Sequence, residues 1–475
     1  MSSKNVTLTT IPAGIRKPGQ YLEYNTRLAV STLPANSQKL LIVGQRLANS
    51  TVAALLATQV FSAADAADYF GAGSQLHLMC KTAIAENPYL DLSAIALDDV
   101  VGGAQATGTI TLTGPATGPG VIRVYVGNRK VEVAIASTDT AAAIATALNA
   151  ALGLIPDLPV TFGVAGAVLT GTNRHKGTVG NLVDLTVEVT AAGVAAAVVA
   201  MANGATDPDV STALTQVYAS QFDKIVMPYN DQTSITALRT HLDSVSGPVE
   251  QRPGCGVVAV DSALAAATTL AAAINGGRIV PAELRGTRSP AYEIAAALAA
   301  VWCSEPDPAR PLNGLPLVTI AAPPIASRLS RTEQENCLAN GMTPLEVGPG
   351  ERVQIVRLIT SYTKNAQGIN DVSLLDATTI TSLDYTRRAI RERIALRFPR
   401  DKISTKKRTA ARVRTEILDV LHKLEDLEIL DNVDAYKDQL IVEKDDQNVG
   451  QLNARIPANV VPGLHVFAAV IDLYL

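Results

Sequence analysis

Residues 222–245, FDKIVMPYNDQTSITALRTHLDSV, decide the fold. A short apolar run typical of a buried strand is followed by a segment that Asp231 can cap as a helix. The pattern repeats over 254–275, GCGVVAVDSALAAATTLAAAIN, and a further helix is expected over 288–305, where Trp302 should lie in the core. Strands and helices that alternate at these lengths predict an α/β layer.

Upstream, the same layer is expected to continue. KLLIVGQ (39–45) is a compact apolar run typical of a buried strand, and 62–88 predicts helix, turn, helix with Ser62 as the first N-cap. LDLSAIALDD (90–99) should return as a strand. Downstream, Ser330 and Glu333 form a capping-box pattern before a short helix that Gly341 ends. We assign 31–99 and 206–345 together to one α/β core.

Between these two parts the composition changes. Residues 100–205 are rich in Thr, Gly, Ala and Val, and GTITLTG, GVIRVYVG and KVEVAIA are short strand patterns with a hairpin signal at VGNRK. A helix is expected from about 139, with Ser137 or Thr138 as its N-cap. These residues predict an inserted, β-rich α+β domain.

The C-terminal part, 346–455, has a strong charge pattern. A basic amphipathic helix is expected over 382–398 and carries Arg387, Arg388, Arg391 and Arg393, whereas 416–446 is acidic. Three interpretations are open: a solvated face paired within the chain, a docking surface for a protein of opposite sign, or a nucleic-acid surface. Base-stacking aromatics do not interleave with the basic residues, which argues against nucleic acid.

The segment GLHVFAAVIDLYL (463–475) is a strand pattern that is largely apolar on both faces. Such a strand expects cover on both sides. It either pairs in the chain's own sheet or is donated to a neighbour through the connector ARIPANVVPG (454–463). The first thirty residues, with PGQYLEYN, predict an extended arm.

Composition sets broad limits on function. The chain has 475 residues, 47% of them hydrophobic, with a net charge of −4. That length is enough for several cores, and the charge gives no general reason to expect nucleic acid. Its four cysteines, Cys80, Cys255, Cys303 and Cys337, are widely spaced, so neither a disulfide framework nor a zinc site is expected. Neither a signal peptide nor a membrane span is expected, which favours a protein made in a cytoplasm.

Catalytic signatures are missing from the sequence. There is no P-loop, no nucleophile elbow and no HExxH. GAGSQL (71–76) falls between predicted helices, where a dinucleotide loop would not be. Asp261 is expected to be the N-cap or a first-turn acid of the next helix rather than a site residue. NRHKGTVGN (173–181) is expected to be a solvated hairpin rather than an anion site. The five histidines are scattered, so we expect no enzyme, cofactor or metal.

Four blocks together resemble the tail sheath proteins of contractile bacteriophage tails, in the Mu-like branch. They are IPAGIRKPGQYLEYN, DPARPLNGLPL with IASRLSRTEQENCLANGMTPLEV, LDYTRRAIRERIALRFPRDKI, and VFAAVIDLYL. They occur in the expected order and cover both ends of the chain and the region after about Arg310. The middle domain matches less distinctively.

The resemblance implies a structural subunit that polymerises around a tail tube and contracts to drive it through the cell envelope without nucleotide hydrolysis. It implies a tube-proximal α/β domain built from both chain ends, an outward-facing insertion at 100–205 and exchanged terminal strands. The implied partners are further copies, the tube, baseplate and terminator proteins, with no direct contact to nucleic acid or membrane. The implied location is the virion tail, assembled in the host cytoplasm.

The resemblance also implies where contacts between subunits lie. Strand exchange is expected in the arm 1–30 and in the connector and strand 456–475, at Gln20, Tyr21, Leu22, Glu23, Tyr24, Val466, Phe467, Ala468, Ala469, Val470, Ile471, Asp472, Leu473 and Tyr474. Tube contact is expected in 346–455, at Lys406, Lys407, Arg408, Arg412 and Arg414; the alternative is that the same residues form contacts between subunits. The alternatives are an α/β enzyme with an appended β-rich domain, a surface-layer or adhesin-like protein and, less favoured because such proteins are smaller, a tube subunit.

Overall fold

The computed structural model describes residues 17–20, 22, 33–34, 36–403, 408–448 and 450–474. These residues form two compact units. The body comprises the described residues of 36–385, 428–432 and 458–474, and the C-terminal unit contains those of 386–427 and 433–457. The predicted combination of α/β and α+β parts is confirmed.

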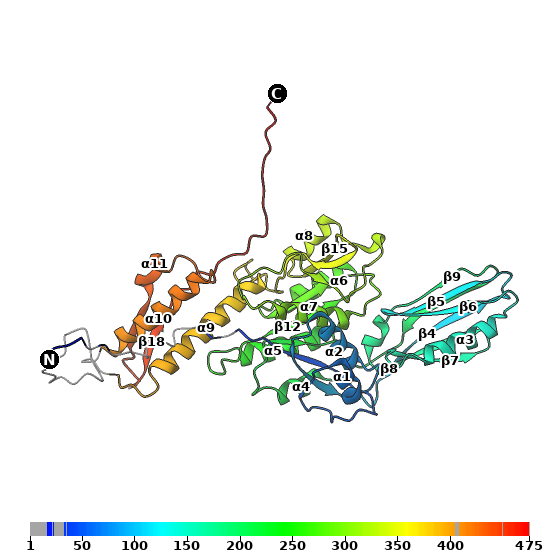
Figure 1. The fold of residues 1–475 in the computed structure, drawn as a ribbon, viewed down its shortest axis with the longest axis horizontal. Coiled ribbons are helices and arrows are strands. Elements are labelled where there is room, and N and C mark those ends of the chain that lie inside the picture. The colour runs from blue at the N-terminus through cyan, green and yellow to red at the C-terminus, as the bar shows by residue number, and fades with distance from the viewer. Residues whose placement is uncertain are drawn as a thin grey trace. The chain divides into compact units, whose positions relative to one another are not determined.

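A nine-stranded sheet runs through the body, in the order β14-β16-β15-β13-β12-β11-β1-β3-β2 (Figure 1). Parallel pairing joins β15, β13, β12, β11, β1 and β3, in this order across the sheet. At the two ends, β2, β16 and β14 pair antiparallel. Their bounds are β1 Lys39–Gln45, β2 Thr58–Gln59, β3 Asp91–Leu97, β11 Lys224–Val226, β12 Cys255–Val260, β13 Ile279–Glu283, β14 Pro316–Leu317, β15 Thr343–Gly348 and β16 Arg352–Ile355.

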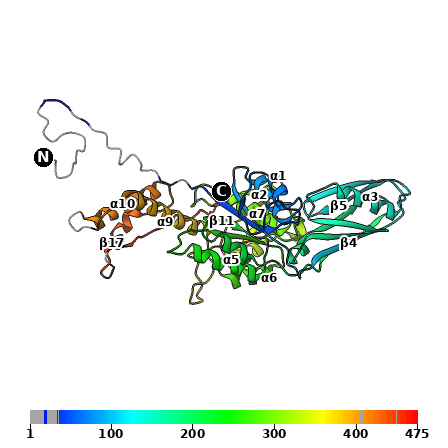
Figure 2. The same cartoon turned by 90° about the horizontal axis from the view of Figure 1, so that it is seen from below.

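Helices cover both faces of this sheet. Figure 2 shows α1, α2 and α7 on one side of β11, with α5 and α6 on the other. The helices are α1 Ala63–Phe70, α2 Gln75–Glu86, α4 Val210–Gln216, α5 Gln232–Val245, α6 Leu264–Ile274, α7 Ala291–Ser304 and α8 Arg331–Ala339, with a 3-10 turn at Ile325–Ser327. Almost all of α7 is buried, which explains its Ala-rich sequence. Trp302 is a core residue of this helix, as predicted.

Local capping chemistry starts several helices where the sequence predicts. Ser62 accepts a hydrogen bond from the Asp65 amide, and Asp231 accepts one from the Ser234 amide. Ser330 and the Glu333 side chain form a complete capping box. Each contact satisfies an N–H that would otherwise lack a partner in the first turn.

The insertion forms two sheets and one helix around its own core. One sheet has the order β10-β4-β8-β7 and the other β6-β5-β9, and α3 contacts both. The elements are β4 Gln105–Thr113, β5 Gly120–Val126, β6 Arg129–Ile135, α3 Ala141–Gly153, β7 Val160–Ala165, β8 Val168–Lys176, a 3-10 helix at Thr178–Leu182, β9 Leu185–Val189 and β10 Ala195–Ala202.

The expected cap of the insertion's helix was wrong. Thr140, not Ser137 or Thr138, accepts a hydrogen bond from the Ala143 amide, at 3.2 Å. Thr138 has a φ of +80°, so the chain is still turning there and the helix can begin only two residues later.

The boundary expected at 345 falls inside β15. This strand pairs with β13 and β16, so 346–385 belongs with the nine-stranded sheet and not with the C-terminal unit. The next strand, β16, is short and ends at Ile355. Helix α9, Ala377–Arg397, crosses from one unit into the other.

In the C-terminal unit, α10 (Thr409–Asp426) is amphipathic and buries one apolar face, which includes Val413, Ile417, Val420, Leu421 and Leu424. The remaining elements of this unit are α11 Val433–Tyr436, a 3-10 turn at Lys437–Gln439, β17 Ile441–Lys444 and β18 Leu452–Arg455. β17 and β18 form a separate antiparallel two-stranded sheet.

Candidate assembly site

The C-terminal segment 466–474 pairs with no described part of the chain. It forms no strand, and its large apolar side chains, such as Phe467, Ile471 and Tyr474, are 78–96% exposed. Figure 1 shows the C-terminal end of the chain as an extended trace without helix or strand. An apolar segment with this strand pattern normally lies covered, so its exposure makes it a candidate for an interface.

The connector before this segment is fixed to the body. Val460 bridges to Leu430, and the Val461 amide donates to the Ile429 carbonyl at 3.2 Å. The Asn313 side-chain nitrogen and His465 Nδ1 lie 2.8 Å apart. Partial burial and the nearby Arg357 guanidinium lower the pKa of His465, which favours its neutral form. The free segment therefore begins at a defined point, directly after His465.

The predicted N-terminal exchange residues fall mostly outside the described part. Tyr21, Glu23 and Tyr24 lie outside the described residues. Gln20 and Leu22 are described; both are exposed, and neither is in a strand.

The two-stranded sheet of the C-terminal unit has two open edges among the described residues. β17 pairs only with β18, and most of its residues are exposed, including Ile441. Two-stranded sheets are only marginally stable in water, because each strand leaves one row of backbone groups unpaired. This sheet therefore has the geometry of an acceptor for further strands.

The predicted tube-contact residues differ in their surroundings. Lys406 and Lys407 lie outside the described residues. Arg408 is exposed and precedes α10, and Arg412 is half exposed, 2.9 Å from Asp401. Arg414 instead donates to the backbone carbonyls of Leu440 and Lys437, at 2.8 and 2.6 Å. Arg414 therefore ties α10 to the residues that lead into β17.

Part of the basic helix is paired within the unit, as one interpretation of its charge pattern predicted. Arg393 is buried and contacts Glu416 and Asp419 of α10, at 3.2 and 2.7 Å. Burial by itself raises the pKa of Asp419, but Lys423 and Arg393 outweigh that effect and hold it below its usual value. These contacts join the basic and acidic stretches of the sequence.

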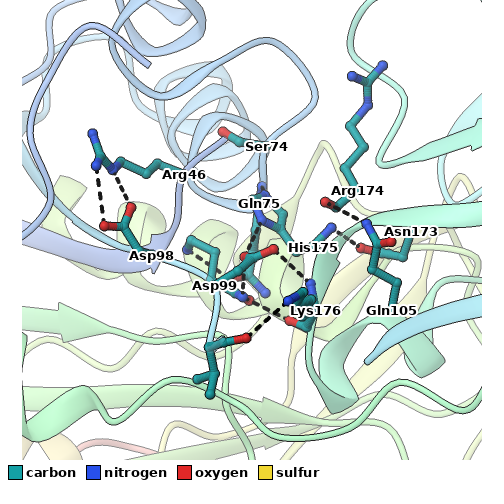
Figure 3. A network of polar contacts seen from close by, with 12 residues as sticks. Arg46, Ser74, Gln75, Asp98, Asp99, Gln105, Asn173, Arg174, His175 and Lys176 are labelled. Atoms are coloured by element: carbon teal, nitrogen blue, oxygen red, sulfur yellow. Dashed lines mark hydrogen bonds and ion pairs between the residues drawn. The ribbon is translucent and has the colours of Figure 1, made fainter. Parts of the chain in front are cut away.

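A second site of interest is the place where an α/β enzyme would bind its ligand. The chain order reverses between β1 and β11, and ligands of open α/β sheets bind at the carboxyl ends of strands at such a reversal. Figure 3 shows that side chains of the insertion occupy this place. Gln45, the last residue of β1, donates to Asp99 and to the Lys176 carbonyl of β8, both at 2.8 Å.

His175 is the central residue of this contact. Its Nε2 accepts the first N–H of α2, from Gln75, at 3.1 Å, so Nδ1 carries the hydrogen and donates to Asp99 at 3.0 Å. Burial by itself raises the pKa of Asp99, but hydrogen bonds from His175, Lys176 and Gln45 hold it below its usual value. The remaining cavity of about 10 Å³ has room for one water molecule. The His175 imidazole therefore accepts a hydrogen bond from the N-terminus of α2, which could otherwise bind an anion.

The insertion is fixed to the rest of the body at a second place. Arg129 forms an ion pair with Glu293 of α7, and Asn128 accepts a hydrogen bond from Ser289 at 2.8 Å. Arg288 lies over the Tyr125 ring, 3.7 Å from its centre. Two separate polar contacts therefore set the orientation of the insertion on the body.

Two sequence predictions were wrong here. Asp261 caps no helix: its carboxylate accepts from the Gly286 amide at 3.2 Å, and α6 begins after Ala263. The stretch 173–181 is no solvated hairpin, because Asn173 and His175 are buried against the body. GAGSQL does lie between helices, α1 and α2, as predicted. Sequence reasoning missed the role of His175, because Gln75 is a hundred residues away and no local signal links them.

Among the described residues, no group of three or more His, Cys, Asp or Glu side chains is placed to hold a metal ion. No helix in the same residues is both long and apolar enough to span a membrane.

Comparison with known proteins gives the class of this fold. The phage tail sheath protein central domain matches residues 203–361, and the phage tail sheath C-terminal domain matches 370–473. The helical sheath of the anti-feeding prophage in its contracted state aligns with a TM-score of 0.50 at 12% identity, covering 97% of this chain and 99% of that one. The sheath tail protein of Desulfitobacterium hafniense aligns with a TM-score of 0.47 at 13% identity, covering 87% and 91%. The two family-model matches, together with the anti-feeding prophage sheath, define a tail sheath fold.

One relative covers nearly the whole chain. The Mu-like prophage FluMu tail sheath protein of Haemophilus influenzae is 33% identical over 487 residues, which span 99% of this chain and all of the relative. The chain belongs to the phage tail sheath protein family, as its sequence predicted, and it resembles the Mu-like branch. It is a structural protein of a phage tail and not an enzyme.

Proposed function

We propose that this chain polymerises as a helical sleeve around a tail tube, and that shortening of the sleeve drives the tube through the cell envelope. Subunit rearrangement supplies the work, and no nucleotide is consumed. Baseplate and terminator proteins are further partners of the sleeve, which assembles in the host cytoplasm. Neither nucleic acid nor membrane is a direct partner. The name of the anti-feeding prophage relative, a helical sheath in a contracted state, supports this proposal.

The observation that carries the proposal is the exposed segment 466–474. Its two faces are both largely apolar, so it needs cover from two sides. The described residues of its own chain give it none. Addition to a neighbour's sheet supplies backbone hydrogen bonds along an edge and pockets for alternate side chains.

The acceptor in this proposal is the β17–β18 sheet of a neighbouring subunit. Both of its edges are open among the described residues, and it gains stability with every strand added. One edge takes 466–474 of one neighbour. The other takes the arm around Gln20–Tyr24 of another, so that each subunit is linked to two others through shared sheets.

The parts of the chain then take different roles. The insertion 100–205 faces outward, and the C-terminal unit faces the tube. Tube contact is made by exposed cations such as Arg408 and Arg412, whose pairs with acidic groups contribute only about 0–1 kcal/mol each. Such weak contacts release when the sleeve shortens. Arg414 supports β17 instead, because its guanidinium is engaged by backbone carbonyls.

The enzyme alternative has no support in the geometry. The crevice where an α/β enzyme would bind its ligand holds His175, and too little space remains there for a small-molecule substrate.

The proposal is tested by electron microscopy of the full-length chain, alone and produced together with its tail tube protein, against a version that ends at His465. This truncation removes only the exposed residues and keeps the contact between Asn313 and His465. We expect helical tubes from the full-length chain and folded monomers, with unchanged thermal unfolding, from the shorter one.

Each other outcome decides a specific point. Tubes from both versions would place the linkage elsewhere in the chain. The absence of tubes from the full-length chain with its tube protein present would overturn the sleeve itself. Unfolding of the truncated version would mean that the segment belongs to its own subunit.

A further inference from the structure

The insertion has an outer face that is typical of a solvated surface. On the sheet β6-β5-β9, Arg123 and Glu132 pair at 3.1 Å, and Lys130 and Glu132 pair at 2.8 Å. Glu188 of β9 pairs with Arg288 of the body at 3.1 Å. This face therefore carries the usual mixture of charges of both signs.

The outer face of the other sheet is different. Along β4, alternate residues Thr107, Thr109, Thr111 and Thr113 point away from the core, while the residues between them are buried. In register, Thr109 lies between Val199 of β10 and Thr170 of β8, and Thr111 lies between Ala197 and Val168. We call this the threonine face.

Charged groups approach the threonine face only where it meets the rest of the body. There, Arg174 and Lys176 of β8 bend back onto backbone carbonyls of Leu158 and Val100. The outward positions of β7, including Thr161 and Ala165, carry no charge and are exposed. This uncharged stretch of sheet differs from the charged β6-β5-β9 face of the same domain.

On the side of the insertion opposite the threonine face, helix α3 lies beside β6 and presents an uncharged surface of its own. Helix α3 packs its Ile144, Ala145, Leu148 and Leu152 side into the core, against the inward face of the same sheet. Its outward side presents alanines, Thr146 and, just beyond the helix, Leu154, which is 83% exposed. The helix contains no charged residue. The threonine face and the outer side of α3 are therefore back to back, with the core between them.

We propose that insertions of neighbouring copies stack front to back, the outer side of α3 of one copy lying on the threonine face of the next. The inference rests on the proposed helical assembly, which brings identical insertions side by side. Two neutral surfaces can be buried together without desolvating a charge, whereas burial of the β6-β5-β9 face would desolvate several. The small side chains on both surfaces let a helix approach a flat sheet closely.

This contact is heterologous, because it joins two different surfaces. Repeated contacts of this kind build rings or helices rather than closed dimers. It therefore suits a helical sleeve. A threonine face that met its own copy would instead produce pairs, so the stoichiometry of cross-linking separates the two arrangements.

The test places Thr111→Cys and Ala147→Cys together in the full-length chain, produced with its tail tube protein. The four native cysteines are unpaired and buried or partly buried, so they interfere little. After oxidation of assembled sleeves, we expect a ladder of covalent oligomers beyond the dimer. The matched control, Ala134→Cys with Ala147→Cys, carries its first thiol on the charged face and should give at least tenfold less product.

A charge series provides a second measurement that needs no disulfide. Thr111→Lys should raise the concentration needed for assembly at least tenfold, Ala134→Lys should change it less than twofold, and adding Ala147→Glu to Thr111→Lys should restore it. Three outcomes would each overturn the stacking and leave the sleeve intact. They are normal sleeves without a ladder of cross-linked oligomers, covalent dimers from Thr111→Cys alone, and no recovery of assembly in the double variant. Absence of sleeves from the unmodified chain would overturn the proposed function instead.

Discussion

The two units of this molecule treat the edges of their sheets in opposite ways. The nine-stranded sheet of the body ends on both sides in strands of two residues, β2 and β14, and β14 begins with Pro316. Short strands and proline at an edge discourage further pairing. The β17–β18 sheet has no such protection, and the segment 466–474 has no partner within the described chain. In the proposed sleeve, the protected sheet serves the fold of the subunit and the open one serves assembly.

The largest effect is expected from removing backbone donors in the exposed segment. Ala468→Pro with Ile471→Pro deletes two N–H groups that point to opposite edges of a strand. We expect the concentration needed for assembly to rise at least a hundredfold, with no change in thermal unfolding of the monomer. Ala468→Thr with Ile471→Val keeps both N–H groups and should assemble normally. Normal assembly of the proline variant would show that segment 466–474 has no role in strand pairing. The contrast between a protected and an open unit would then not hold.

Glu283, on β13, tests the nine-stranded sheet of the body, whose edges are protected. Its carboxylate is fully buried at the end of β13 and has no hydrogen-bond partner among the described residues. Burial, with Asp261 nearby, raises its pKa to about 8. The folded state therefore keeps a proton that the unfolded chain loses near pH 4.5. The contribution of Glu283 to stability is therefore full below about pH 4.5 and is lost as the pH rises from there toward 8.

Replacing this carboxyl should remove that dependence. At pH 8.5 we expect Glu283→Gln to raise the free energy of unfolding by roughly 3 kcal/mol, and at pH 5 by much less. Denaturant titration at the two pH values measures the difference. Glu335→Gln, at an exposed position of α8, is the control and should have no effect. Equal effects of Glu283→Gln at both pH values would show that Glu283 is ionised in the folded protein.

Arg414 tests what supports the open sheet. Arg414→Ala removes two hydrogen bonds to the carbonyls of Leu440 and Lys437, next to β17. We expect it to destabilise the C-terminal unit by roughly 2 kcal/mol and to speed hydrogen exchange in β17, whereas Arg412→Ala should cost less than about 1 kcal/mol. If Arg414→Ala weakened tube binding without changing hydrogen exchange in β17, Arg414 would be a tube contact, as the sequence predicted, and not a support of β17.

The smallest effect is expected at the protected edge. Pro316→Thr restores one backbone N–H in β14, but the strand remains only two residues long. We expect unfolding to change by less than about 0.5 kcal/mol, and light scattering to show no new association. Aggregation of this variant would mean that the proline alone protects the edge.

The sequence predicts those parts of the fold that local rules control. Strand and helix alternation gives the α/β layer, and Ser62, Asp231 and Ser330 cap the predicted helices because a cap needs only neighbours three residues away. The addition of β15 and β16 to the nine-stranded sheet could not be predicted, since it depends on pairing with β13 across sixty residues.

The candidate site shows the same limit. The apolar pattern of 466–474 predicts a strand that needs cover, but not where the cover comes from. Arg414 looks like Arg412 in the sequence, yet its guanidinium is held by backbone carbonyls more than twenty residues away. His175 carries no local signal for its contact with the N-terminus of α2. Each of these roles depends on the approach of distant segments.

The anchoring of His465 by Asn313 sets the reach of the segment that follows. Nine residues, 466–474, extend at most about 30 Å at roughly 3.3 Å per residue. If the link survives contraction, an acceptor edge must stay within that radius of His465 in both the long and the short sleeve. The tether therefore limits how far neighbouring subunits can slide or turn before a shared strand would have to be pulled out.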